Sequence, residues 1–357
     1  MDSALKPNNL DDPLCGYELR HVIPNQDRQL AYAIVVPKEC RSIQHFSDQT
    51  ENPGQLMRIG LFADRNQSKA VALQVFMSRM PCEVDLKDWL MLQATRFRAR
   101  LTSVEPSTRH NGSQALTAEG TSGEGQQTQL SRLTALVDSG RIFLFVASAS
   151  PERYAAESQT ITIASESFEL LEPVGTSRME AWKKNRSQAP DFVVAYPASW
   201  SSRRGAASVR GKSSLDLQLM REEKLQAYVR VKATDPAAAL SFNPDPAAEL
   251  KLLQDELASA SIRCTSAWQS ITEPSWRAID GVKQRWIAEG TLAGRRLDLR
   301  FGVVWRQGLL FSVLGISIPY ERNPLLSMRS KRAYDIALAT AARIIANEGD
   351  SDDHALF

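Results

Sequence analysis

The sequence contains few of the residues that carry most protein chemistry. Its 357 residues include only four cysteines and four histidines. No two cysteines stand at the CxxC spacing of zinc or redox sites, so free thiols in a reducing cytoplasm are the simplest interpretation. No histidine has a partner at the helical His-x-x-x-His spacing, which argues against a zinc site. We therefore expect no bound metal.

Long apolar runs are also missing. No stretch approaches the roughly 18–20 apolar residues that a membrane helix needs. Residues 1–12 are polar and lack the apolar segment of a signal peptide. We therefore expect a cytoplasmic protein without an integral membrane segment. The formal net charge is only +2, so no global field predicts binding to nucleic acid or to an anionic membrane.

Motifs that mark common enzyme classes are absent as well. The sequence has no Gly-x-Ser-x-Gly elbow, no P-loop and no dinucleotide-binding fingerprint. Gly281, Gly290 and Gly294 fit strands or hairpins instead. Cys40 lacks a base that can be placed beside it, so a small apolar residue in a sheet is a simpler interpretation than a nucleophile. The sequence predicts no enzyme, no catalytic residue and no cofactor.

The strongest positive signal is an internal repeat. An apolar run ends at Pro37, and a similar run ends at Pro197, 160 residues later. Two further runs begin with Gly-x-x-Phe and end at Pro151 and Pro319, 168 residues apart. A near-constant offset over more than one landmark predicts a duplicated domain.

Each half has the pattern of strands, a helix, three further strands and a closing helix. Tight turns favour antiparallel pairing, and amphipathic helices must cover apolar sheet faces. The predicted fold class is α+β, with two tandem units that each consist of an antiparallel sheet covered by helices. The predicted segments are a disordered N-terminus over 1–16, a first unit over 17–172, a linker over 173–190, a second unit over 191–347 and an acidic tail over 348–357.

The pattern resembles the PsbP-like fold, an α/β/α sandwich whose members include the DcrB family and the EagR chaperones of bacterial type VI secretion. A first strand ends at Pro197 and is followed by Trp200, a glycine-containing strand passes Gly281, and a late Gly-x-x-Phe strand ends at Pro319. The first unit departs from this pattern, with Cys40 where Trp200 stands in the second.

The resemblance implies a binding protein, because members of this fold are mostly non-enzymatic. It implies photosystem assembly, engagement of small GTPases or chaperoning of secreted effectors. EagR-type proteins act as dimers that shelter transmembrane segments of effectors, and two fused units can mimic such a dimer. This step is an analogy between folds.

Two tryptophans of the second half are candidate partner-binding residues. Trp268 and Trp276 fall between the predicted helix and the next strand, where exposed aromatic side chains would form a hot spot for a protein. The alternative is that both fold back onto the core of the second unit.

Two polar segments are also candidates. Residues 201–212 carry Arg203 and Arg204 among four positive charges and no acid, so they can steer an acidic partner or form a solvated hairpin loop. The tail over 348–357 is acidic and ends in two apolar residues, so it can dock in a groove or simply keep the protein soluble.

The function predicted from the sequence is a non-enzymatic adaptor or chaperone that binds a protein partner and serves a bacterial secretion system. Nucleic acid is not expected as a partner. The alternatives are a protein that binds a small ligand or lipid in an enclosed apolar cavity, a structural subunit of a larger assembly, and an enzyme of unknown type.

Overall fold

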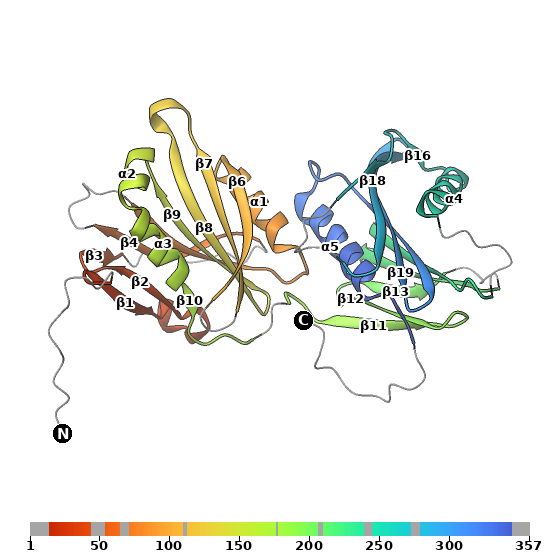
Figure 1. Ribbon diagram of the computed structural model, residues 1–357, viewed down its shortest axis with the longest axis horizontal. Helices are drawn as coiled ribbons and strands as arrows, with labels where there is room; N and C mark the ends of the chain where they lie inside the picture. The colour runs from red at the N-terminus through yellow and green to blue at the C-terminus, as the bar shows by residue number, and fades with distance from the viewer. Residues whose placement is uncertain are drawn as a thin grey trace, which may run out of the picture. The chain divides into compact units, whose positions relative to one another are not determined.

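The computed structural model describes residues 14–43, 54–64, 71–109, 113–175, 178–205, 210–238, 245–272 and 279–344. The chain divides into two compact units, which Figure 1 shows with their elements labelled. The first unit is made of Met1–Cys82 and Leu86–Met179, and the second of Glu83–Asp85 and Glu180–Phe357.

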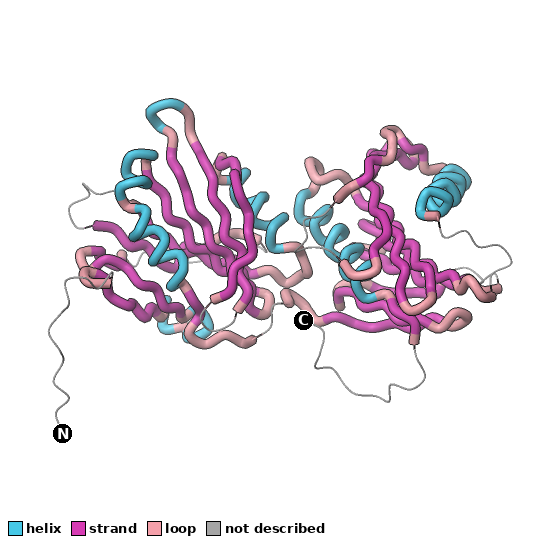
Figure 2. The backbone as a smooth tube through the Cα atoms, viewed as in Figure 1, coloured by secondary structure: helices cyan, strands magenta, loops and turns pink. Residues whose placement is uncertain are grey.

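Strands dominate the first unit (Figure 2). Its strands are β1 (Tyr17–Val22), β2 (Tyr32–Pro37), β3 (Cys40–Ser42), β4 (Met57–Asp64), β5 (Ala72–Arg79), β6 (Ala99–Thr108), β7 (Gln114–Ser122), β8 (Gln129–Asp138), β9 (Arg141–Ala149) and β10 (Glu169–Leu170). Its helices are α1 (Leu86–Arg96), α2 (Pro151–Ala156) and α3 (Ser158–Ser167).

These strands form two antiparallel sheets. The larger sheet has the order β3-β4-β5-β9-β8-β7-β6, and the smaller has the order β1-β2-β10. The smaller sheet shares one apolar cluster with the larger one, and the largest side chains of this cluster are Tyr32, Phe62, Phe143, Phe145 and Phe168. Helix α3 packs on β2, β8 and β9, while α1 packs on β6, β7 and β8.

The second unit has the same kinds of element in the same order. Its strands are β11 (Trp182–Ser187), β12 (Phe192–Pro197), β13 (Ser201–Arg204), β14 (Lys212–Arg221), β15 (Lys224–Thr234), β16 (Arg263–Cys264), β17 (Gln269–Ser270), β18 (Val282–Leu292), β19 (Arg295–Arg306), β20 (Leu309–Ser317) and β21 (Ala342–Arg343). Its helices are α4 (Pro246–Ser259) and α5 (Pro324–Thr340).

The topology of the second unit repeats that of the first. Its larger sheet runs β13-β14-β15-β20-β19-β18-β16, with β17 paired to β18, and its smaller sheet runs β11-β12-β21. The landmark prolines Pro37 and Pro197 end the equivalent strands β2 and β12. The two units therefore build the same strand order from sequences that share only a few landmarks.

The predicted sandwich of one sheet covered by helices is wrong for both units. The expected first strands, β2 and β12, do not join the larger sheets. They pair with β1 and β11 instead, and β11 lies inside the predicted linker over 173–190. Each larger sheet is therefore covered on one face by a second sheet together with helices, α2 and α3 in the first unit and α5 in the second. Apolar periodicity identified these strands but not their partners, because it does not encode which strands pair.

The larger sheet of the second unit has two distinct faces. Leu215, Leu217 and Leu219 of β14 belong to the apolar cluster that includes Tyr334 of α5. On β19, Leu299 and Phe301 belong to another cluster, which includes Leu253 and Leu257 of α4. Because side chains alternate along a strand, the residues of β14 between the leucines lie on the face that carries α4. This second face positions the candidate site.

Candidate functional site

The structure does not bring the sequence-predicted binding residues together. Arg203 and Arg204 lie on β13, at one edge of the larger sheet of the second unit, and Trp268 precedes β17 near the other edge. Six strand-to-strand steps separate β13 from β17, about 29 Å at a spacing of about 4.8 Å. Trp276 lies outside the described residues.

Trp268 is half-buried in the second unit. It packs against the apolar cluster beneath α4, and its ring meets the ring of Phe301 edge-on with 6.5 Å between centroids. This contact resembles core packing more than an exposed hot spot. Trp200, the landmark residue after Pro197, is also a core residue and is buried against Leu217 and its neighbours. Cys40, at the matching position of the first unit, is only partly buried.

The two arginines of β13 point to different faces. Arg203 lies opposite Asp216 of β14, and Arg204 lies opposite Leu215. Residues that face each other across an antiparallel pair point to the same side, so Arg203 shares the α4 face with Asp216. The segment over 201–212 was predicted as a loop. It begins instead as the edge strand β13, which places one arginine on each face of the sheet.

Asp216 organises the polar half of the α4 face. Its side chain is only 4% exposed. It accepts a hydrogen bond of 2.6 Å from the Tyr228 hydroxyl and one of 2.9 Å from Nε of Arg230, and Nε of Arg203 lies 3.8 Å away. Burying one carboxylate among such partners fixes their positions, because an unpaired buried charge is strongly unfavourable.

These contacts shift the pKa values of Tyr228 and Arg230, the two partners of Asp216 on β15. Burial, together with the hydrogen bond to Asp216, raises the pKa of the Tyr228 hydroxyl above its usual range. Burial alone would lower the pKa of Arg230, but its hydrogen bond to Asp216 raises it instead. The Arg230 guanidinium also lies against the Tyr228 ring, 5.4 Å from its centroid. Both side chains thus hold a fixed protonation state at neutral pH.

Two lysines extend this group of charged side chains toward the C-terminal end of β15. Lys232 forms an ion pair with Glu256 of α4, and Lys212 lies at the start of β14, opposite Thr234. We refer to Arg203, Lys212, Arg230 and Lys232 as the basic belt. The belt extends from the edge strand β13 across β14 and β15 to the side chains of α4.

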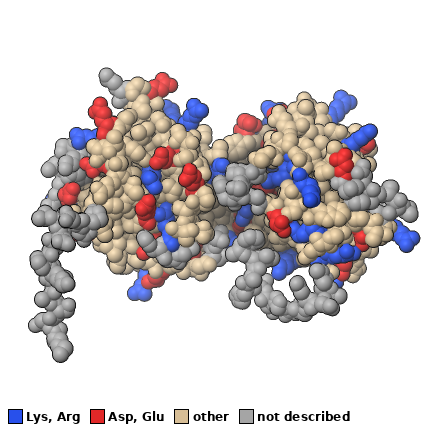
Figure 3. Space-filling model, viewed as in Figure 1, with Lys and Arg blue, Asp and Glu red and all other residues tan. Residues whose placement is uncertain are grey.

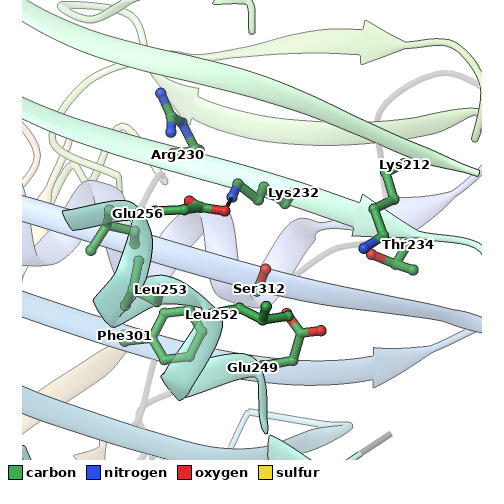
Figure 4. Close-up of a pocket in the computed structure, with 11 residues that line it drawn as sticks. Lys212, Arg230, Lys232, Thr234, Glu249, Leu252, Leu253, Glu256, Phe301 and Ser312 are labelled. Carbon is green, nitrogen blue, oxygen red and sulfur yellow. Dashed lines mark hydrogen bonds and ion pairs between the residues drawn. The ribbon is translucent and has the colours of Figure 1, made fainter. Parts of the chain in front are cut away.

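A small cavity of about 90 Å³ lies between α4 and the sheet (Figure 4). We refer to it as the α4 cleft. Three belt residues and two glutamates of α4 line it, with apolar and hydroxyl groups below: Lys212, Arg230, Lys232, Glu249, Glu256, Phe301, Ser312 and Leu314. Ligand pockets usually measure about 300–1,000 Å³, so the cleft fits one side chain or a few waters rather than a whole small molecule.

The cleft carries charges of both signs. Glu249 is held partly out of water, and burial raises its pKa, although Lys212 and Lys232 oppose this shift. Glu256 is occupied by its ion pair with Lys232. The excess of positive charge in the belt therefore lies on the side of β13, whereas the acidic side chains next to the belt lie on the side of α4.

A larger cavity of about 420 Å³ lies in the first unit, lined by residues that include Asp27, Arg79, Arg141 and Met179. The buried Arg141 guanidinium pairs with Asp138, whose carboxylate also accepts the backbone N–H groups of Val174 and Gly175 at 3.2 and 3.0 Å. The lining mixes these three charged residues with Leu30, Met77, Pro81 and Met179, so the cavity is not the enclosed apolar one that was expected for a lipid.

Within the described ranges, no group of three or more His, Cys, Asp or Glu side chains is placed to hold a metal ion. None of the four cysteines, all of which lie in the described ranges, forms a disulfide, and Cys82 is buried. No helix in the part of the chain that the structure describes is long and apolar enough to cross a bilayer.

Counting charge by unit would have pointed to the belt. Residues 180–357 carry 25 Lys and Arg against 20 Asp and Glu, a formal charge of +5, while residues 1–179 carry 18 against 21, a formal charge of −3. The net charge of the whole chain hides this difference. Basic side chains gather on the face of the second unit that Figure 3 shows. A unit with this surplus attracts acidic partners from a distance.

Comparisons with known proteins find distant structural similarity only. No family model matches the chain, and no curated protein matches it. The solution structure of cyanobacterial PsbP from Synechocystis sp. PCC 6803 is 16% identical over 46% of this chain and 98% of that chain, with a TM-score of 0.32. The immunity protein TplEi of the T6SS from Pseudomonas aeruginosa is 10% identical over 87% of this chain and 94% of that chain, with a TM-score of 0.22.

These scores are too low to establish a family or a function. PsbP, one of these neighbours, is the protein that gives its name to the fold that the sequence pattern resembles. The comparisons give no support to the DcrB and EagR part of that resemblance.

Proposed function

We propose that this chain is a non-enzymatic adaptor or chaperone that binds an acidic segment of a protein partner on the basic belt of its second unit. The observation that carries the proposal is the convergence of Arg203, Tyr228 and Arg230 on the buried Asp216. A carboxylate that is 4% exposed holds the Arg230 guanidinium in place by a hydrogen bond, so this side chain loses little entropy when a partner binds.

A protein fits the belt better than a nucleic acid does. Glu249 and Glu256 stand beside the lysines at the foot of α4. A phosphate backbone repeats one charge at short intervals, so it would meet these carboxylates with repulsion. A protein segment can place acids over Arg203 and Arg230 and uncharged or basic residues over α4. The mixed pattern of charge therefore favours a protein.

Service to a bacterial secretion system stays a prediction of the sequence resemblance. Nothing in the belt distinguishes a secreted client from any other acidic protein. The proposal is accordingly limited to the chemistry of the partner.

The belt is tested with a defined peptide. The probe is a fluorescein-labelled peptide of twelve residues in which aspartate alternates with leucine, measured by fluorescence anisotropy at 50 and 300 mM salt. Arg203→Glu should weaken binding about tenfold, which corresponds to about 1.4 kcal/mol. The Arg203 side chain is 67% exposed, but a glutamate here stands opposite the buried Asp216 and lowers stability, so circular dichroism must first show that the variant is folded.

The matched control is Arg295→Glu, which makes the same change of charge at an exposed position in the hairpin between β18 and β19. It should change the affinity less than twofold. Equal losses in both variants would mean that only the net charge matters. Tighter binding of a DNA duplex than of the peptide, also at 300 mM salt, would replace the protein partner by nucleic acid.

A further inference from the structure

The cavity of about 420 Å³ in the first unit has the size and the mixed lining of a small-molecule site. We refer to it as the first-unit cavity. Ligand pockets usually measure about 300–1,000 Å³ and combine apolar walls with a few polar groups that orient the ligand. Leu30, Met77, Pro81 and Met179 supply apolar surface, and every residue that lines the cavity belongs to the first unit. The basic belt of the second unit is therefore a separate site.

Hydrogen bonds join the segments that form the walls. These segments are the connection between β1 and β2, the C-terminal end of β5 and the turn between β8 and β9. The backbone N–H of Met80 donates to the carbonyl of Gly140 at 2.7 Å, which ties β5 to the turn. Arg141 donates to the carbonyl of Gln29, which ties β9 to the β1–β2 connection. The walls are thus held together without a ligand, which lowers the entropy that a ligand must overcome.

Two arginines face each other in this cavity. Arg79 of β5 lies directly opposite Arg141 of β9, so both side chains point to the same side of the sheet, and like charges at this spacing are unfavourable. Asp138 pairs with Arg141, and its carboxylate also accepts the backbone N–H of Gly175 at 3.0 Å. Arg79 is exposed, and among the described residues no carboxylate forms an ion pair with it. Arg79 is therefore available to an anion.

Asp27 supplies the opposite charge from another wall. It stands between two short 3₁₀ turns, Pro24–Gln26 and Arg28–Leu30, and is half-buried. One of its carboxylate oxygens accepts the backbone N–H of Gln29 at 2.9 Å. No basic side chain in the described part of the chain forms an ion pair with Asp27. The first-unit cavity therefore presents one cation and one carboxylate that are both open to ionic partners, beside apolar side chains.

We propose that the first-unit cavity binds a free α-amino acid with an apolar side chain. The carboxylate of the ligand pairs with Arg79, whose planar guanidinium can form two parallel hydrogen bonds with it. The ammonium group pairs with Asp27, and the side chain packs on Met77 and Met179, because methionine adapts to apolar groups of different shape. A ligand with an anionic group alone would leave Asp27 unpaired. This binding does not depend on the function proposed for the second unit.

Binding is tested by isothermal titration calorimetry of the full chain with L-leucine, L-methionine and L-phenylalanine. At least one of them should bind with a Kd below about 1 mM. Glycine should bind about tenfold more weakly or not at all, because it has no side chain to bury. The N-acetyl derivative and the amide of the best ligand should each bind about tenfold more weakly, because each lacks one of the two charges.

Two variants assign the charges. Arg79→Gln should weaken binding of the amino acid about tenfold and leave binding of its amide unchanged, because the amide has no carboxylate. Asp27→Asn should weaken binding of the amino acid to a similar extent and leave binding of the N-acetyl derivative unchanged. Asparagine keeps a side-chain oxygen that accepts from Gln29, so the turn is preserved. The matched control is Arg100→Gln, at an exposed position on β6 outside the cavity, which should change the affinity less than about twofold.

Failure of all three amino acids to bind would refute the proposal. Equal binding of the amino acid and its N-acetyl derivative, with a loss only in Arg79→Gln, would reveal a site for simple anions and refute the role of Asp27. An affinity that neither variant changes would place the ligand outside the first-unit cavity. The aspartate–leucine probe reports on the basic belt of the second unit, so this proposal and the proposed function can fail independently.

Discussion

Close packing of one tyrosine against a glycine decides the position of β2 in the first unit. Tyr32 is fully buried, and a Cβ atom at Gly60 of β4 would lie 1.9 Å from its hydroxyl oxygen. The absence of a side chain at Gly60 lets the ring lie flat on the larger sheet. The Tyr32 hydroxyl has no hydrogen-bond partner among the described residues, so the ring is retained at the expense of a buried polar group.

Gly60→Ala should destabilise the first unit by about 1–3 kcal/mol, because the added methyl group overlaps the tyrosine hydroxyl. Tyr32→Phe alone should not reduce stability, since it removes a buried and unpaired hydroxyl. In the double variant much of the loss should be recovered. Denaturant unfolding of the four proteins checks this, and strictly additive effects would show that the two residues do not meet.

The basic belt shows which part of a site a sequence can reveal. Arg203 was identified because it stands in a run of positive charge. Asp216, Arg230 and Lys232 were missed, because they alternate with apolar residues and look like the wet face of any strand. Their convergence depends on the register of β13, β14 and β15, and the register follows from pairing rather than from local pattern.

Two equivalent hairpins, β8–β9 and β19–β20, explain why the repeat could be recognised in the sequence. Ser139 and Gly140, between β8 and β9, have positive φ angles of 46° and 76°, and Gln307 and Gly308, between β19 and β20, have 49° and 74°. Two consecutive residues of positive φ form the tight turn that suits a twisted hairpin, and glycine adopts the second position without strain. The Gly-x-x-Phe landmark therefore records a backbone requirement.

Strand partners could not be read in the same way. The runs that end at Pro37 and Pro197 were correctly identified as strands, but they were assigned to the larger sheets. Their true partners are β1, at the start of the predicted first unit, and β11, inside the predicted linker. The strand Trp182–Ser187 contains two lysines and an arginine and no clear alternation, so composition gave no sign of it.

Protonation of Glu249 should stabilise α4. Burial raises the pKa of this carboxyl above its value in the unfolded chain, against the opposing effect of Lys212 and Lys232. The folded state therefore holds the proton more tightly. The resulting stabilisation is complete below the unfolded pKa of about 4.3 and is lost as the pH rises through the folded pKa.

Hydrogen exchange of the α4 amides, corrected for intrinsic rates, should show protection that falls as the pH rises from about 4 toward neutrality. In Glu249→Gln the protection should depend less on pH, because glutamine stays neutral throughout. Glu256 lies on the same helix and pairs with Lys232, so Glu256→Gln is the matched comparison. An unchanged pH profile in Glu249→Gln would refute the role of Glu249.

At the level of the whole molecule, each unit has its own interior. Among the described residues, the two apolar clusters of the second unit draw on residues between Phe192 and Ala341, and the main cluster of the first draws on residues between Val22 and Leu170. Chains of about 150 residues bury enough surface to fold alone. Duplication has therefore produced two self-sufficient interiors with different surface charge.

Residues 180–357, produced alone, should fold and unfold in one cooperative transition, because the described members of their two apolar clusters lie between Phe192 and Ala341. This piece carries 25 basic and 20 acidic residues, and the piece 1–179 carries 18 and 21. At pH 7 the second piece should therefore bind a cation-exchange resin under conditions in which the first flows through. Calorimetry and ion-exchange chromatography provide the two measurements. Residues 180–357 that remained unfolded, while the full chain showed a cooperative transition, would contradict this prediction. The interior of the second unit would then depend on contacts outside it, and the two interiors would not be self-sufficient.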